Sequence, residues 1–255
     1  GVLWMLEVEK GLKGAERFEW LRQHGFEVGE SRPRSTSGDS SSKGKIVATY
    51  DYTDETGELL FQVCRFQRPD GEKTFLQRRK PRADDDPSRI KNGWVWSVKG
   101  IRQVPYRLDD LTEAIALGRQ IVIVEGEKDV DRLATLGITA TCNAGGAGKW
   151  PKGMSEFFRD ADVVMIPDND DAGEKHVALV GKELNEVVSS IRVARLPNLP
   201  PKGDTSDFLD LGHSQDELRR HIADAPEWLP SGGSEPGEYH SKMGLRMWAD
   251  QNVPG

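Results

Sequence analysis

The chain has 255 residues, of which 36% are apolar and 30% charged, and its formal net charge is −7. No apolar run approaches the roughly 20 residues that a membrane helix needs, so we expect no membrane-spanning segment. Cys64 and Cys142 lie far apart without a CxxC pair, which excludes a zinc ribbon and a disulfide framework within this sequence. We expect both to be small buried side chains, and the absence of a secretory signal predicts a cytoplasmic protein.

Two segments precede the first predicted strands. Residues 1–30 have apolar side chains at helical spacing, and the Ser/Gly/Pro-rich run to residue 45 is typical of a linker. Residues 46–108 are predicted to form a strand-rich subdomain, with turns at Glu-Thr-Gly and Pro-Asp-Gly. Near its end, "GWVWSVKG" places Trp94 and Trp96 on one face of a strand, and we expect both tryptophans to belong to the core.

The strand-rich subdomain is also the basic part of the chain. Residues 62–107 contain 12 Lys/Arg and 5 Asp/Glu, a local excess of +7, so the remainder carries −14. This excess favours a surface for a polyanion such as nucleic acid, although an ordinary solvated surface would have the same composition. We expect the densest basic run, which is Arg78, Arg79, Lys80 and Arg82, to contact phosphates.

From about residue 109 the pattern changes to strands that alternate with helices. The predicted strands are the apolar runs at 120–126, 138–143, 162–168 and 190–197, and predicted helices lie between them at 127–137, 152–160 and 172–188. Such strands predict an α/β fold over residues 109–212, with a central, mostly parallel four-stranded sheet flanked by helices. Residues 213–255 are predicted to form a closing helix, at 214–228, and a tail.

Carboxylates gather where three of these strands end. Glu125 and Asp129 follow the first strand, Asp168 and Asp170 the third, and Asp204 and Asp207 the fourth. Parallel sheets bind ligands at the carboxyl ends of their strands, and oxygen-only ligands suit Mg²⁺ or Mn²⁺. The sequence therefore predicts a divalent-metal site there, although any single cluster of this kind could also cap a helix.

These motifs resemble the Toprim domain. The segments "EGEKD" (125–129), "DNDDAG" (168–173) and "KGDTSDFL" (202–209) look like those of DnaG-like primases and of the primase–helicases of phages and mobile elements. The resemblance covers residues 109–212 and implies a Toprim fold preceded by a smaller strand-rich subdomain. It also implies that Glu125 is the Toprim glutamate, that Asp168 and Asp170 are its DxD pair, and that Asp129, Asp204 and Asp207 are further acidic positions.

The resemblance implies a DNA-directed primase, a metal-dependent nucleotidyltransferase that joins nucleoside triphosphates on a single-stranded DNA template in a bacterial or phage-infected cell. Two divalent ions would then activate the 3′-hydroxyl and stabilise the leaving pyrophosphate. Glu125 would bridge a metal or act as general base, with Lys128 and Lys149 near the nucleotide. The sequence contains neither a zinc ribbon nor a helicase motif, so we expect a helicase partner or a further domain to supply those functions.

The loop "NAGGAGKW" (143–150) is not a Walker motif, because Trp150 stands where Ser or Thr is required. It follows a strand and therefore faces the same crevice as the carboxylates. Its glycines would let a nucleotide approach the backbone, and a plain flexible turn is an equally good interpretation.

Three other functions remain open. A Toprim nuclease or topoisomerase-like enzyme would use the same acidic site, and the only candidate tyrosine nucleophiles are Tyr50, Tyr52, Tyr106 and Tyr239. A non-catalytic nucleic-acid-binding module would leave the site idle. A haloacid-dehalogenase-like phosphatase would use Asp168, Asp170, Lys202, Asp204 and Asp207. It would leave Glu125 without a role, and only 36 residues separate Asp168 from Asp204.

Overall fold

The computed structural model describes Gln23 and residues 44–230. The chain divides into two units, Gly1–Ser42 and Lys43–Gly255, and all described residues except Gln23 belong to the second. The predicted N-terminal helical segment, the linker and most of the tail lie outside the described residues. None of the described helices is long and apolar enough to cross a membrane.

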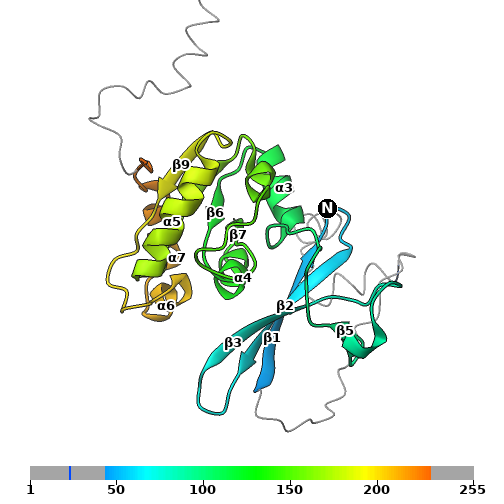
Figure 1. Ribbon diagram of the computed structural model, residues 1–255. Helices are drawn as coiled ribbons and strands as arrows, with labels where there is room; N and C mark the ends of the chain where they lie inside the picture. The colour runs from blue at the N-terminus through cyan, green and yellow to red at the C-terminus, as the bar shows by residue number, and fades with distance from the viewer. Residues whose placement is uncertain (1–22, 24–43, 231–255) are drawn as a thin grey trace, which may run out of the picture. The chain divides into compact units, whose positions relative to one another are not determined.

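An antiparallel sheet begins the described unit (Figure 1). Its strands are β1 (Lys45–Thr53), β2 (Leu59–Gln67) and β3 (Lys73–Arg78), and β2 lies in the middle. The two turns contain Gly57 and Gly71, both at positive φ, which only glycine adopts without strain. The prediction of a strand-rich part with two turns ahead of the parallel sheet is therefore confirmed.

The segment after β3 differs from the prediction. The 3₁₀ turn η1 (Pro87–Arg89) leads into a small hairpin of β4 (Ile90–Lys91) and β5 (Trp94–Val95). Trp94 and Trp96 are only partly buried, so the prediction that they belong to the core is wrong. Cations cover Trp94 instead, because the Arg78 guanidinium and the Lys80 ammonium each lie 4.1 Å from the centroid of its ring.

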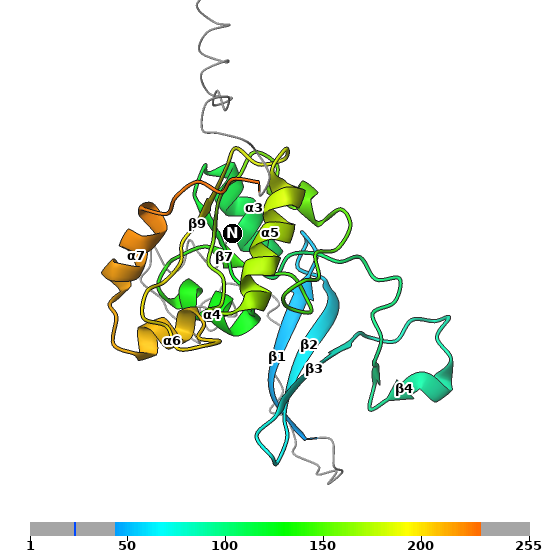
Figure 2. The same cartoon turned by 60° about the vertical axis from the view of Figure 1, so that its left-hand side comes forward.

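The rest of the unit is built on a parallel sheet with strand order β7-β6-β8-β9. Figure 2 shows this part of the chain, with helices around the sheet. The strands are β6 (Ile121–Ile123), β7 (Ala140–Thr141), β8 (Asp162–Met165) and β9 (Ser190–Val193). Each pair of neighbours is parallel, and most of the strand side chains are buried. The predicted α/β class and the four-stranded sheet are therefore confirmed.

The predicted helices are present with changed ends, and two helices were missed. Between the strands lie α4 (Glu127–Thr135), the 3₁₀ helix η2 (Met154–Phe158) and α5 (Asp171–Leu184). Sequence reasoning missed α3 (Leu108–Ala116) and the short α6 (Thr205–Asp210). The closing helix α7 (Gln215–Ala223) ends early because the backbone of Pro226 and Trp228 hydrogen-bonds to β9 instead.

An aromatic cluster joins the antiparallel sheet to the parallel one. Tyr52 and Phe61 stack with ring centroids 4.5 Å apart, and Tyr106 lies 5.2 Å from Tyr52. The amide of Tyr106 donates a hydrogen bond to the carbonyl of Cys142, which directly follows β7. Because these side chains belong to one continuous core, the two sheets are held in a fixed arrangement. Cys64 and Cys142 are buried and free, as predicted.

Candidate active site

The end of β6 supplies the first carboxylate. Glu125 follows β6, and Gly126 is the N-cap of α4 in an extended conformation. The Glu125 side chain is half-buried, and its Oε1 lies 3.3 Å from the amide nitrogen of Asp168, which donates to it. Burial raises the pKa of Glu125, and the charges of Asp170 and Asp129 raise it further. Glu125 therefore faces the end of β8, as expected for neighbouring parallel strands.

Asp168 has the most strongly perturbed carboxyl group of this region. Its side chain is half-buried and accepts no hydrogen bond from any described residue. Burial raises the pKa of Asp168 to about 8, and the nearby charges of Glu125, Asp129, Asp204 and Asp170 contribute in that order. Four further carboxylates thus lie close enough to act on Asp168, and this clustering is what the sequence predicted.

Asp170 and Gly173 determine how α5 meets the site. Asp170 is the N-cap of α5, where its Oδ1 accepts hydrogen bonds from the amides of Ala172 and Gly173 at 2.9 Å each. A Cβ atom at position 173 would lie 2.4 Å from the Asp168 carbonyl oxygen and 2.7 Å from Glu125 Oε1. Only glycine therefore lets the first turn of α5 approach Glu125 so closely. Sequence reasoning missed this role, although Gly173 is part of the quoted motif.

Asp129 lies behind these residues. It is 4% exposed, and its Oδ1 accepts hydrogen bonds from the Ser206 amide at 2.9 Å and the Ser206 hydroxyl at 2.5 Å. Burial raises the pKa of Asp129, and the charge of Asp204 adds to the effect. The hydrogen bonds therefore fix Asp129 against the first turn of α6.

Asp204 and Asp207 form a capping box at the start of α6. Asp204 accepts a hydrogen bond from the Asp207 amide, and Asp207 accepts one from the Asp204 amide. The Lys128 ammonium donates a hydrogen bond to Asp204 as well. These bonds explain how two acidic residues can stand together at the start of α6. In the part of the chain that the structure describes, no three His, Cys, Asp or Glu side chains are placed to hold a metal ion together.

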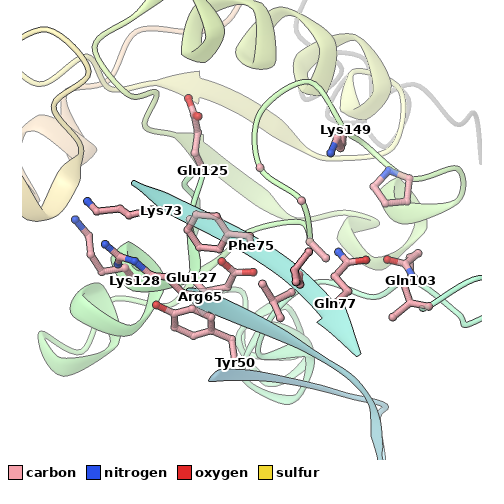
Figure 3. A pocket seen from close by; sticks show the side chains of 18 of the residues that line it. Tyr50, Arg65, Lys73, Phe75, Gln77, Gln103, Glu125, Glu127, Lys128 and Lys149 are labelled. Atoms are coloured by element: carbon pink, nitrogen blue, oxygen red, sulfur yellow. The ribbon is translucent and has the colours of Figure 1, made fainter. Parts of the chain in front are cut away.

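The carboxylates open into a cavity of about 850 Å³ between the two sheets (Figure 3). Glu125, Asp129, Asp168, Asp204 and Lys128 line it from the parallel sheet and its helices. Side chains on one face of the antiparallel sheet line it from the other side, and these are Tyr50, Val63, Arg65, Lys73, Phe75 and Gln77. Sequence reasoning missed Arg65, Lys73 and Phe75. The alternation of Lys73, Phe75 and Gln77 along β3 is the signal that could have grouped them.

The glycine-rich loop after β7 completes the cavity wall. Gly145, Gly146 and Lys149 line the cavity, and Gly145 and Gly146 adopt positive φ. The buried Asn143 side chain donates to the carbonyls of Gly146 and Lys149, and the Gly148 amide donates to His176 Nδ1 at 3.1 Å. Burial lowers the pKa of His176 to about 4, so the imidazole is neutral and can accept this bond. Side chains thus fix the conformation of this loop.

The residues of the predicted basic run do not line the cavity. Arg79 is buried and forms a two-bond ion pair with Asp85, with Nη–Oδ distances of 2.6 and 2.5 Å. Arg78 is buried too, and its Nε donates to Gln62 at 2.8 Å. Lys80 and Arg82 are exposed, but neither lines the cavity. Of the six basic residues predicted to bind nucleic acid or nucleotide, Lys128 and Lys149 are the two that do line it.

A second buried carboxyl group, that of Glu127, lines the cavity (Figure 3). Glu127, the first residue of α4, is 6% exposed and accepts a hydrogen bond of 2.9 Å from the Tyr52 hydroxyl. The Cys142 sulfur lies 3.9 Å from the same hydroxyl. Burial raises the pKa of Glu127. The bond connects β1 to the start of α4, so it fixes the antiparallel sheet next to Glu125. Sequence reasoning missed Glu127, because "EGEKD" gives no sign that one of its carboxylates is buried.

The fold resembles that of solved primase structures. The Aquifex aeolicus primase with its zinc-binding and RNA polymerase domains matches with a TM-score of 0.51 and 20% identity, over 71% of this chain and 40% of that chain. A DNA primase domain from Pseudomonas aeruginosa matches with a TM-score of 0.48 and 21% identity, over 87% of this chain and 63% of that one. The E. coli primase catalytic core matches with a TM-score of 0.46 and 18% identity, over 84% of this chain and 62% of that chain.

At these identities the likeness concerns the fold. The described residues have a Toprim fold, in which an antiparallel strand-rich part precedes the parallel sheet. It is the form of this fold that the catalytic cores of DnaG-type primases have. The chain spans between 40% and 63% of the length of the three structures. No protein-family model and no curated protein sequence matches it.

Proposed function

We propose that this chain is the catalytic core of a primase-type nucleotidyltransferase, which makes short primers on single-stranded DNA from nucleoside triphosphates. One observation carries the proposal. A single cavity brings carboxylates from three strand ends opposite cations that have no carboxylate partner among the described residues. These cations are Arg65 and Lys73 on the antiparallel sheet and Lys149 on the glycine-rich loop. Such a cavity suits a substrate that brings phosphates and divalent cations together.

The acidic residues fit a divalent cation by their charge. The pKa of about 8 at Asp168 means that its negative charge is opposed by burial and by four neighbouring carboxylates, and a cation would relieve that repulsion. Because no three described carboxylates are placed to hold an ion together, Mg²⁺ or Mn²⁺ would be held by Glu125, Asp168 or the second oxygen of Asp170 together with oxygens of the substrate phosphates. Asp129 and Asp204 would lie behind them. A bound cation supplies electrostatic stabilisation of the charge that develops on the transferred phosphoryl group.

The protein's own side chains would bind and orient the substrate, and one of them would accept the proton. Glu125 is half-buried with a raised pKa, which suits a base that takes the proton of the primer's 3′-hydroxyl. Arg65, Lys73 and Lys149 would bind the phosphates of the nucleotide and of the strand. The Lys128 ammonium stays with Asp204, so its proposed part is to position that carboxylate. A helicase partner or a further domain would deliver the template, and this is part of the same proposal.

The competing functions are weaker on structural grounds. A topoisomerase-like cleaver needs an accessible tyrosine, and Tyr50, Tyr52 and Tyr106 are each at most 8% exposed, whereas Tyr239 lies outside the described residues. A haloacid-dehalogenase-like phosphatase would leave Glu125 without a role, although Glu125 lines the same cavity as Asp168. A metal-dependent nuclease would use the same carboxylates, so only the reaction products distinguish it.

The test is incubation with single-stranded DNA, labelled nucleoside triphosphates and Mg²⁺ or Mn²⁺. We expect short labelled oligomers that depend on both the template and the metal, and no such products from Glu125→Gln. Shortened template without incorporation would identify a nuclease instead. Metal-independent DNA binding without any product would identify a binding module, and either result would overturn the proposed function.

A further inference from the structure

Phe75 is the one aromatic side chain, among residues 44–230, that is exposed rather than buried or partly buried. Its exposed fraction is 51%. The ring lies in the cavity that contains the carboxylates, and Figure 3 shows it extending from β3 with Arg65 and Lys73 beside it. An exposed apolar ring inside a charged cavity adds nothing to the core, so its position calls for a ligand with an apolar surface.

The residues around Phe75 define the chemistry of that ligand. Arg65 is the cross-strand partner of Phe75, and Lys73 precedes Phe75 by two residues on the same face of β3. Neither cation forms an ion pair with a described residue, and Arg65 Nε is buried without an acceptor there. A ligand that fits this face therefore combines a flat apolar surface with anionic groups, which is the combination that a nucleotide has.

We propose that Phe75 is a stacking platform for a nucleobase, held next to the phosphate-binding cations. This rests on the proposed function, because it names the part of the nucleic-acid substrate that the same cavity contacts. A cavity of about 850 Å³ is large enough for a nucleotide. Stacking is tolerant of sequence, because every base has a π-face. Phe75 therefore contributes affinity and the orientation of the base, and it does not select a particular base.

Four binding measurements by fluorescence anisotropy test this directly. Wild type and Phe75→Ala are each titrated with a labelled single-stranded oligodeoxynucleotide and with an abasic deoxyribose–phosphate chain of the same length. We expect Phe75→Ala to weaken binding of the oligonucleotide by about 5- to 150-fold, the range for loss of one stacked base. Binding of the abasic chain stays unchanged, because only the base contacts the ring.

Two further variants serve as controls. Val47→Ala removes an apolar side chain that is 52% exposed on β1 of the same sheet and is not among the residues that line the cavity. It should bind both ligands as the wild type does. Phe75→Tyr keeps an aromatic face and should restore oligonucleotide binding, whereas Phe75→Leu should not. Because residue 75 is exposed, all of these variants should melt at the wild-type temperature.

Repeating the titrations with a nucleoside triphosphate in place of the oligonucleotide shows which base stacks on Phe75, that of the incoming nucleotide or one of the strand. If only the triphosphate responds to Phe75→Ala, the platform takes the incoming nucleotide, and if only the oligonucleotide responds, it takes a base of the strand. Equal losses for the oligonucleotide and the abasic chain, or no loss for any ligand, would overturn the inference. Base-dependent binding without primer synthesis would contradict the proposed function alone, and primer synthesis with normal binding by Phe75→Ala would contradict the inference alone.

Discussion

The cavity and the loops around it contain the same acidic and basic residue types in different states. In the loops, the charges are matched inside the protein: Asp207 belongs to the capping box of α6, and Arg79 pairs with Asp85. In the cavity only some of the charges are matched, because Asp204 bonds to Lys128 whereas other charged side chains have no such partner among the described residues. The side chain of Asp168 accepts no hydrogen bond from a described residue, and Lys73 has no carboxylate partner among them.

This difference is informative because unmatched buried charge is costly. A half-buried carboxylate among other carboxylates lowers stability unless a ligand compensates it. The matched charges need no ligand, since hydrogen bonds and ion pairs already stabilise them. The contrast therefore separates residues whose charge is compensated within the fold from residues whose charge is not compensated by the described residues, although all of them are Asp, Arg or Lys in the sequence.

The largest expected effect is on primer synthesis, when a carboxylate of the cavity, Asp168, is compared with a carboxylate of the α6 capping box, Asp207. Asp168→Asn should lower primer synthesis by at least ~1,000-fold, because it removes charge from the centre of the site while keeping its shape. Asp207→Asn is the matched control with the same chemical change. It should keep activity within about 10-fold, because Asp207 acts through the helix cap. Comparable losses in both variants, measured by labelled nucleotide incorporation, would remove the distinction between the two regions.

A smaller effect is expected on DNA binding, when the cations that line the cavity are compared with the exposed cations of the basic run. Arg65→Ala with Lys73→Ala should weaken binding of single-stranded DNA and lower the log–log salt slope by about 1.4, since each phosphate contact contributes roughly 0.7. Lys80→Ala with Arg82→Ala changes the net charge equally but lies outside the cavity, so its slope should stay near that of the wild type. Anisotropy titrations across a salt series measure both slopes. If the second pair lowers the slope more than the first, the nucleic acid follows the basic run and not the cavity.

Much of the fold could be predicted because it depends on local patterns. Four largely apolar runs separated by helical segments predict the parallel sheet, and the glycines at 57 and 71 predict the hairpin turns. Helix α6 was missed because it has only six residues and is stabilised by a capping box, not by apolar periodicity. The early end of α7 was missed because it depends on pairing with β9, which is distant in the sequence.

The candidate site could be predicted only in part, for a related reason. Clustering of carboxylates at strand ends follows from topology, so the group around Asp168 was predictable from the sequence. Which charges are already matched depends on contacts between distant segments, such as Lys128 with Asp204. A local excess of positive charge likewise does not show that Arg79 forms an ion pair with Asp85, whereas Arg65 lines the cavity.

The smallest expected effect is on the stability of the metal-free protein, and it concerns Asp168 again. Its pKa is about 8 in the folded state and has the ordinary value of 3.8 in the unfolded chain, so between these values the folded protein holds a proton that the unfolded chain has released. Stability in EDTA should therefore fall as the pH rises from about 4 to 8.

Asp168→Asn cannot ionise, so its melting temperature should match that of the wild type near pH 4 and exceed it by a few degrees above pH 8. The expected difference is modest because Asp168 is only half-buried and because ~1 kcal/mol changes the melting temperature of a chain this size by about 2–4 °C. The melting temperature of Asp207→Asn, measured in the same way, should instead lie below that of the wild type, since this variant weakens the capping box of α6. Parallel curves for wild type and Asp168→Asn would show that the Asp168 charge is already compensated inside the protein.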